Sequence, residues 1–159
     1  MIGFLAGTGE GRRDVIQVRY DEPAYSFLAS TPHLDEVQSV LVDDLEIHVD
    51  VSGRVLYVDG YSPRTRWVAI DAVPPVAQDG EVRADIPNPV VRGSSVQLIP
   101  PMAWSIGFNR ISGWLCVGDA VARESAQAIR IQPGIILVLN GLQLVAIWLR
   151  VRPIPAPDN

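Results

Sequence analysis

The sequence predicts an all-β protein that contains two copies of one antiparallel meander. Val and Ile, which favour strands, occupy 35 of the 159 positions. Thirteen Gly and thirteen Pro interrupt the chain at short intervals, as turns between strands would. The pattern of the first half also returns in the second half. With 48% hydrophobic and 19% charged residues, the chain is neither a disordered acidic segment nor a coiled coil.

The first copy begins with two short strands. Residues 16–20 (IQVRY) alternate and end at the turn-prone DEP, and residues 25–29 (YSFLA) follow. The clearest alternation predicts one long strand over residues 40–51, with Leu45, Ile47, Val49 and Val51 on one face and Asp44, Glu46, His48 and Asp50 on the other. Ser52-Gly53 then forms a tight turn, and residues 54–58 run back antiparallel.

The middle of the chain is rich in proline. Residues 60–101 hold seven of the thirteen prolines, which excludes long regular elements. We expect short strands at residues 67–70, 81–84 and 95–99, with Asp79-Gly80 as the turn that joins the first two. The two ends are expected to be irregular: GTGEG near the N-terminus lacks the Lys of a phosphate loop and is interpreted as a flexible leader, and the tail from Pro153 is expected to be extended.

The second copy repeats the first at an offset of 88 to 89 residues. Tyr20 corresponds to Phe108, Leu28 to Cys116 and Arg54 to Gln143. A meander of about 45 residues cannot bury its apolar face alone. The two copies, at about residues 15–60 and 103–150, should therefore pack about a pseudo-two-fold axis as a sandwich or barrel, joined by the connector at 61–102 in one compact domain.

One strand of the second copy differs in character from its counterpart. Residues 135–139 are apolar on both faces, whereas the corresponding strand of the first copy is half acidic. A strand of this kind is buried on both sides. We therefore expect the second copy to lie centrally or to pair with another surface, and a homodimer is one such arrangement.

Each copy resembles the short bacterial domain-of-unknown-function 2283 family. The first copy carries the motif as VRYDEPAYSFLA and LEIHVDVSGRVLYVDG. The second copy departs from it, with Phe108-Asn109 in place of Tyr-Asp and Asn140-Gly141-Leu142-Gln143 at the final turn. The resemblance covers about 90 residues and implies a small β fold. It also implies a binding role beside toxin-like proteins, and it supplies no catalytic residue.

The composition excludes several function classes. A net charge of −5 argues against nucleic acid, because phosphate binding needs clustered basic residues. All 13 basic residues are arginine, so Schiff-base chemistry has no lysine amine. Cys116 is the single cysteine, interpreted as an inert core thiol in a cytoplasmic protein. The apolar tract at 135–149 is interrupted by polar residues, so no membrane span is expected, and no cofactor is implied.

The alternating acidic strand is one candidate site. Asp44, Glu46, His48 and Asp50 could together bind a divalent cation. The matching strand of the second copy carries no such set, however, so an ordinary solvated face is the favoured interpretation and no metal site is predicted. No serine lies in a nucleophile-elbow pattern near His33 or His48, so no catalytic residue is assigned.

The aromatic residues are the other candidate site. We predict a ligand pocket among six residues: Tyr57, Trp67, Trp104, Trp114, Trp148 and Arg123. Further polar groups that could lie beside it are Arg64, Arg66, Asp119 and Glu124. Packing of the same aromatic side chains into the core is the alternative.

Two hypotheses of function follow. The first is a binding or interaction module without catalysis, such as the acidic partner of a basic protein. The second is a β-barrel cyclase or isomerase that shapes a hydrophobic biosynthetic intermediate, which needs an aromatic cavity more than an acid–base pair. The sequence does not decide whether the protein is an enzyme.

Overall fold

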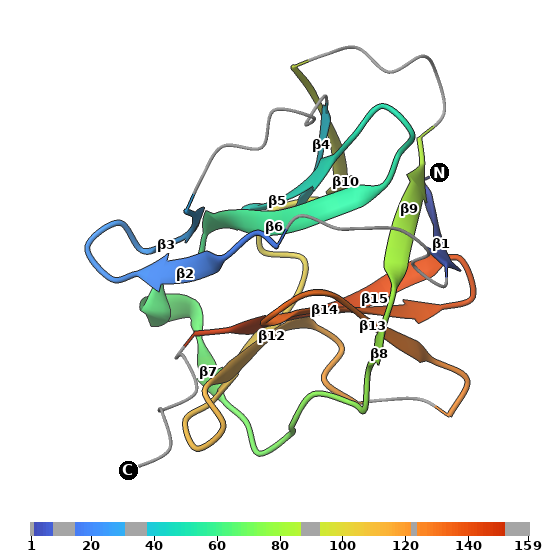
Figure 1. Ribbon diagram of the computed structural model, residues 1–159. Helices are drawn as coiled ribbons and strands as arrows, with labels where there is room; N and C mark the ends of the chain where they lie inside the picture. Colours follow the sequence, from blue (N-terminus) through green and yellow to red (C-terminus); the bar gives the residue numbers. More distant parts are fainter. Residues whose placement is uncertain (1, 8–14, 31–37, 87–92, 122–123, 152–159) are drawn as a thin grey trace, which may run out of the picture.

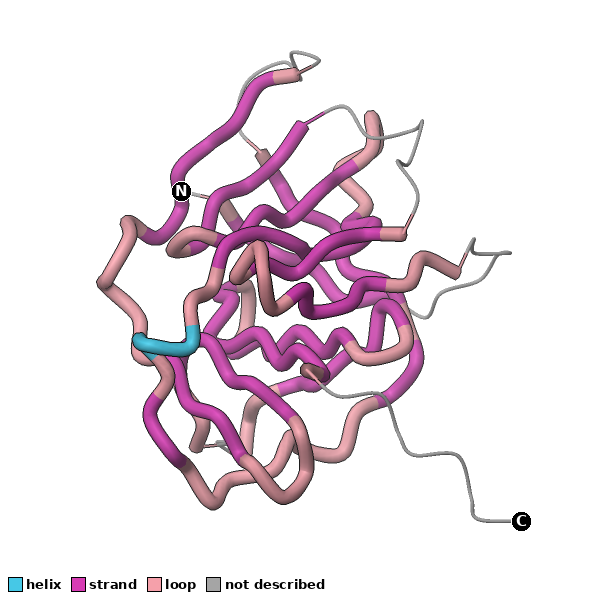
Figure 2. Tube along the Cα trace, turned by 90° about the vertical axis from the view of Figure 1, so that its left-hand side faces the viewer, coloured by secondary structure: helices cyan, strands magenta, loops and turns pink. Residues whose placement is uncertain are grey.

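The protein is all-β, as predicted, and its strands form three open sheets (Figure 1). The computed structural model describes residues 2–7, 15–30, 38–86, 93–121 and 124–151. Within these ranges the one helical segment is a single 3₁₀ turn, η1 (Arg64–Arg66), drawn in cyan in Figure 2. The described part of the chain contains no helix long and apolar enough to cross a membrane. None of the three sheets closes into a barrel, so the structure excludes the barrel form of the predicted architecture.

The two larger sheets contain most of the strands. The first sheet has the order β10-β4-β5-β6-β3-β2, and the second has the order β7-β11-β12-β15-β14-β13-β8. The strands of the first sheet are β2 (Val18–Asp21), β3 (Ser26–Ala29), β4 (Gln38–Val42), β5 (Leu45–Val49), β6 (Val55–Tyr61) and β10 (Ser94–Ile99). Those of the second are β7 (Val68–Ala69), β8 (Gln78–Asp79), β11 (Ile106–Asn109), β12 (Trp114–Gly118), β13 (Gln127–Gln132), β14 (Ile135–Asn140) and β15 (Gln143–Arg150).

The long strand predicted over residues 40–51 is wrong, because the chain turns in its middle. β4 ends at Val42, Asp43 adopts a left-handed φ of 56°, and β5 then runs back antiparallel. Asp tolerates this conformation better than most residues, so Asp43-Asp44 is a turn signal inside the alternation. Val51, predicted to share a strand face with Leu45, lies in the next turn and is 76% exposed, whereas Leu45 is buried.

The main core lies between the facing sides of the two larger sheets, which Figure 1 shows one above the other. Ile47 of β5 and Leu137 of β14 are fully buried in it. Gln132 ties the two sheets together inside this core: its Oε1 accepts a hydrogen bond from the Ile16 N–H at 3.1 Å, and its Nε2 donates to the Leu56 carbonyl at 2.9 Å. The buried amide of this second-half residue thus has hydrogen-bond partners in the first half of the chain, as a buried polar group requires.

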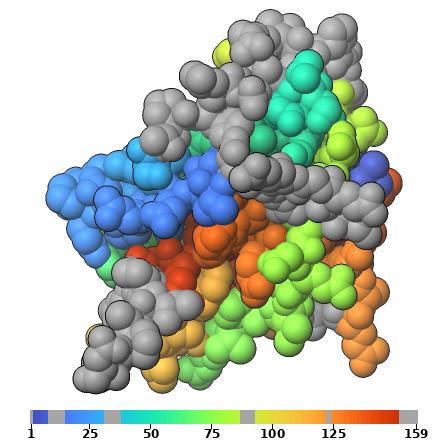
Figure 3. All heavy atoms as spheres, viewed as in Figure 1, coloured from blue at the N-terminus to red at the C-terminus, as the bar shows by residue number. Residues whose placement is uncertain are grey.

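The outer face of the second sheet is also apolar, and the chain covers it with its own connector. Trp148 and Cys116 lie in a second hydrophobic cluster, against which Ile70 and Ala77 of the connector pack. In Figure 3 the green connector lies directly against the orange second sheet. The predicted central position of this sheet therefore has an internal explanation, and the burial of residues 135–139 no longer argues for a homodimer.

Asn109 holds part of that connector in place. Its Nδ2 donates to the carbonyl oxygens of Asp71 and Ala72 at 3.2 and 3.0 Å, while its Oδ1 accepts from the N–H groups of Ile111 and Ser112. An aspartate at this position could accept the two turn hydrogen bonds but could not donate to the connector. This geometry explains why asparagine stands here in the second half.

The third sheet is a two-stranded ribbon, and one of its strands corrects the prediction for the N-terminus. β1 (Gly3–Gly7) pairs antiparallel with β9 (Glu81–Asp85), and Phe4 is fully buried. The start of the predicted leader, Gly7 included, is thus a strand, while residues 8–14 lie outside the described part. The Phe4 N–H donates to the Leu142 carbonyl at 2.8 Å, and the Ala84 N–H donates to the Gly53 carbonyl at 2.7 Å. The ribbon therefore contacts the β5–β6 turn of one sheet and the β14–β15 turn of the other.

The proline-rich middle does not contain the predicted hairpin. β7 pairs in parallel with β11, and β8 pairs in parallel with β13, so Asp79-Gly80 does not join two neighbouring strands. β10 likewise pairs in parallel with β4. These pairings are non-local and leave no turn motif in the sequence. The tail from Pro153, His33 and Arg123 lie outside the described residues.

Candidate functional site

A continuous row of aromatic rings runs from the first sheet to the second at one end of the molecule. Tyr20 lies 5.0 Å from Phe27 within the first sheet, centroid to centroid. Trp67, which follows η1, lies 5.1 Å from Tyr20 and 4.9 Å from Phe108 of the second sheet. The three tilted contacts have interplanar angles of 51° to 59°, a favourable geometry for aromatic pairs. Trp67 is therefore the ring that connects the two sheets.

The indole of Trp67 is fixed by a hydrogen bond at its edge. Its Nε1 donates to the hydroxyl of Ser62 at 3.0 Å, and the Ser62 carbonyl accepts from the Tyr20 hydroxyl at 2.8 Å. Ser62 itself is only 1% exposed. The Trp67 N–H and the Tyr20 hydroxyl thus both have hydrogen-bond acceptors inside the protein. Burial also raises the pKa of the Tyr20 hydroxyl above its usual value.

Arg64 covers this row of rings and is neutralised by a carboxylate. Its guanidinium carbon lies 4.7 Å from the Trp67 ring centroid and 5.8 Å from that of Phe108, within the range of cation–π attraction. Its Nε donates to both oxygens of Glu22, at 2.9 and 2.8 Å. The hydrogen bond to Glu22 raises the pKa of Arg64 further above its usual value. Arg64 therefore stays charged but has an internal counter-ion.

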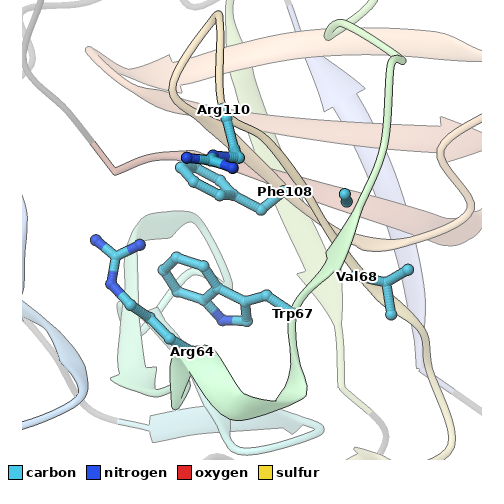
Figure 4. Close-up of a pocket in the computed structure, with 6 residues that line it drawn as sticks. Arg64, Trp67, Val68, Phe108 and Arg110 are labelled. Carbon is cyan, nitrogen blue, oxygen red and sulfur yellow. The ribbon is translucent and has the colours of Figure 1, made fainter.

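An open pocket of about 370 Å³ lies beside Trp67 (Figure 4). Six residues line it: Arg64, Trp67, Val68, Ala69, Phe108 and Arg110. Figure 4 shows the Phe108 ring between the Trp67 ring and the Arg110 guanidinium, with the Arg64 guanidinium at the side of the two rings. The volume falls in the range of small-molecule sites, which are mostly apolar with a few polar groups.

Arg110 differs from Arg64 in its electrostatic environment. It follows β11, its side chain is exposed, and it forms no ion pair with any residue that the structure describes. A guanidinium remains charged at every physiological pH and offers up to five N–H donors. The pocket therefore combines an aromatic wall with one cation whose charge the described residues leave uncompensated.

Five of the six residues predicted to line one pocket lie in different places, and Arg123 lies outside the described residues. Trp67 lines the pocket, whereas Trp104 packs against the main core and Trp148 is buried beneath the connector. Trp114 packs on the outer cluster with Arg150 over its ring at 5.5 Å, and Tyr57 stacks on His48 at 4.4 Å. Among the further polar candidates, Arg64 does line the pocket.

Sequence reasoning missed Phe108 and Arg110. The sequence pattern identifies Phe108 only as the counterpart of Tyr20, and Arg110 lies in a turn with no motif around it. The usable signal was the offset itself. Under the predicted duplication, adding 88 to Tyr20 and Glu22 gives Phe108 and Arg110, which would put a cation at the position of the Arg64 counter-ion.

The acidic strand face predicted from the alternation is divided between separate contacts. Asp50 Oδ1 accepts from the N–H groups of Ser52 and Arg54 at 2.9 and 3.0 Å and so stabilises the β5–β6 turn. Asp44 Oδ2 accepts from Arg66 at 3.3 Å. Glu46 and His48 remain together, and Asp59 of β6 joins them instead.

Comparison with protein-family models and with curated proteins found no match to this chain. The resemblance of each half to the domain-of-unknown-function 2283 family therefore stays a prediction.

Proposed function

We propose that this protein is a binding module whose pocket holds a small molecule with a flat apolar body and an anionic group. The observation that carries the proposal is Arg110, a cation beside an aromatic wall without an ion-pair partner among the described residues. The rings of Trp67 and Phe108 would stack on the apolar body. The Arg110 guanidinium would donate to the anionic group, since carboxylates and phosphates match its planar fork.

The pairing of Arg64 with Glu22 beside the pocket supports this choice of ligand. The Glu22 carboxylate accepts hydrogen bonds from Nε and Nη2 of Arg64, whose guanidinium lies over the Trp67 ring. Arg64 and Arg110 both line the pocket, but Arg110 occupies the position that would correspond to Glu22 and forms no ion pair with a described residue. A ligand carboxylate at Arg110 would supply the counter-ion that Glu22 supplies to Arg64.

The lining favours binding over the cyclase or isomerase hypothesis. The six lining residues are arginine, aromatic or aliphatic. Arginine does not give up its proton in proteins, so this set contains no side chain that could act as a general acid or base near neutral pH.

The charged residues that line the pocket are positive, whereas the chain as a whole has a negative net charge. The net charge of −5 is the basis for expecting a basic protein partner, whereas the two pocket arginines favour an acidic ligand. We therefore place the small ligand at the pocket, and a protein partner that presents an acidic aromatic group is an alternative occupant that the experiment below can distinguish.

The test compares an aromatic acid with its neutral amide by isothermal titration calorimetry. We expect indole-3-acetate to bind with one site per chain and to bind at least tenfold more tightly than indole-3-acetamide. A hydrogen bond to a charged group contributes about 1.5–3 kcal/mol, or roughly 10- to 100-fold in affinity. Arg110→Gln should abolish the preference for the acid, and Trp67→Phe should weaken both ligands.

Arg19→Gln is the matched control, because Arg19 is an exposed arginine on β2 outside the pocket lining. Equal affinity for acid and amide, or equal losses in Arg110→Gln and Arg19→Gln, would contradict the small-ligand proposal. If neither indole binds but a peptide ending in Trp with a free carboxylate does, the occupant is a protein segment instead.

We further propose that the two larger sheets derive from an internal duplication. The strand order β4-β5-β6-β3-β2 in the first sheet has the same topology as β13-β14-β15-β12-β11 in the second. The neighbouring strands within each series are antiparallel. The register shift between His48 and Val49 has its counterpart between Val138 and Leu139, at the same place in each β-meander. Under this proposal, Trp67 lies between the equivalent rings Tyr20 and Phe108, close to the pseudo-two-fold axis.

A further inference from the structure

Two neighbouring strands bring an imidazole and two carboxylates together on the outer face of the first sheet. In the β5–β6 register, Glu46 lies opposite Asp59, and His48 lies opposite Tyr57. The intervening residue Ile47 points into the main core and is fully buried. Because side chains alternate along a strand, Glu46 and His48 project from the other face together.

The three potential ligand atoms are close enough to share one ion. His48 Nε2 lies 2.6 Å from Asp59 Oδ1 and 3.6 Å from Glu46 Oε2, and all three ligand atoms lie within 4.8 Å of one another. Ligands about 2.0–2.2 Å from a tetrahedral Zn²⁺ are roughly 3.3 Å apart. The His48–Glu46 spacing already fits this value, and the His48–Asp59 contact would need to lengthen by less than about 1 Å.

The surroundings fix the imidazole and leave one ligand accessible. The His48 side chain is 8% exposed and its ring stacks on Tyr57, with 4.4 Å between centroids and 19° between planes. Asp59 is 22% exposed and Glu46 is 47% exposed. An ion could therefore reach the cluster from the Glu46 side, and a water molecule could complete its coordination there.

The geometry points to a binding site for a single Zn²⁺-like transition-metal ion at Glu46, His48 and Asp59. An imidazole with two carboxylates suits such borderline ions, whereas Mg²⁺ and Ca²⁺ prefer sets of oxygen ligands alone. The site is separate from the pocket at Trp67, so it is independent of the proposed function. In the second sheet the corresponding positions are Ile136, Val138 and Trp148, which lie under the connector.

The experiment uses the full chain without an affinity tag, freed of metal with a chelator and titrated with ZnCl₂ in a calorimeter. We expect one ion per chain, with at least tenfold weaker binding in Glu46→Gln and in Asp59→Asn. Binding should also weaken on acidification, because protons compete for the same ligand atoms. MgCl₂ and CaCl₂ at equal concentration should give no comparable heat.

Two controls have the same chemistry at other positions. Glu124→Gln removes an exposed carboxylate elsewhere, and His33→Gln removes the other histidine. Both should bind Zn²⁺ like the unaltered chain, and circular dichroism should show that all variants remain folded. His48→Gln removes a buried, stacked ring and can unfold the protein, so Glu46→Gln and Asp59→Asn decide the outcome. No heat with ZnCl₂, equal affinity in all variants, or loss in His33→Gln alone would overturn the site.

Discussion

Asp43 is a buried carboxylate whose charge is compensated by a single arginine. Its side chain is only 2% exposed, and Arg66 donates to both of its oxygens at 2.8 and 2.9 Å. The hydrogen bond from Arg66 to Asp43 raises the pKa of the guanidinium. Removing one partner of such a pair leaves an uncompensated buried charge, which costs about 3–5 kcal/mol. The pair therefore stabilises the β4–β5 turn.

Arg66→Gln should lower the free energy of unfolding by about 3 kcal/mol, measured by urea denaturation. Asp43→Asn should cost less, because asparagine is neutral and tolerates the positive φ of this residue. Arg19→Gln again serves as the control for loss of one positive charge. The assigned role of the pair is wrong if Arg66→Gln and Arg19→Gln have the same stability.

Cys116 should be unreactive as long as the protein is folded. Burial raises the pKa of its thiol from 9.0 to about 12, and the thiolate is the reactive form. Iodoacetamide at pH 8 should therefore leave the native protein unmodified and should alkylate it completely in denaturant, which mass spectrometry can detect. Rapid alkylation of the native chain would contradict the buried position of Cys116.

The same shift predicts how stability depends on pH. Above pH 9 the unfolded chain releases the thiol proton, while the folded chain keeps it until about pH 12. The buried thiol therefore makes its full contribution to the free energy of unfolding below pH 9. This contribution is lost as the pH rises from 9 to 12, by up to about 1.4 kcal/mol per pH unit. Denaturation of Cys116→Ala over this range should lack this slope, whereas parallel curves for the two proteins would refute the assignment.

At the scale of elements, Gly60 lets β6 approach the β4–β5 turn. Its φ is +123°, and a Cβ there would lie 2.6 Å from the Asp44 carbonyl oxygen and 2.9 Å from the Leu45 Cα. Both contacts are with backbone, which cannot move aside easily. Gly141 also has a positive φ, +61°, but a Cβ there would meet nothing within 4 Å.

These two glycines form a matched pair for mutagenesis. Gly141→Ala should lower the free energy of unfolding by about 1 kcal/mol, because alanine is strained only by the left-handed backbone conformation there. Gly60→Ala should cost at least about 2 kcal/mol more, because a backbone clash adds to the strain. Urea denaturation measures both values. Equal costs would mean that β6 does not approach the turn as closely as described.

The elements also show what the sequence could and could not predict. Alternation and turn residues located β2, β3, β6 and the Ser52-Gly53 turn, because these signals are local. Alternation alone passed over Asp43-Asp44, a turn whose flanking strands continue the same apolar pattern. The parallel partners of β4, β11 and β13 depend on non-local contacts, so no local motif could indicate them.

The candidate site was predictable only in part for the same reason. Trp67 and Arg64 were candidates because aromatic and charged residues stand out in the connector. Phe108 and Arg110 join them through the packing of one sheet on the other, which a linear pattern does not encode. Trp114 and Trp148 were predicted to line the pocket only because they are aromatic, but they lie on the opposite face of the second sheet.

At the scale of the whole molecule, the two larger sheets depend on each other. They share one core, Gln132 bonds across it, and the β1–β9 ribbon contacts a turn of each. The pocket itself is built from the connector at Trp67 and from the second sheet at Phe108. Neither sheet could keep its inner face buried without the other. We therefore expect both to unfold in one cooperative transition.

Hydrogen exchange read by mass spectrometry across a urea series measures this cooperativity most directly. Peptides from β4–β6 and from β13–β15 should lose protection at the same urea concentration and with the same dependence on urea. Two separate transitions, with one sheet still protected after the other has exchanged, would contradict the core that the two sheets share.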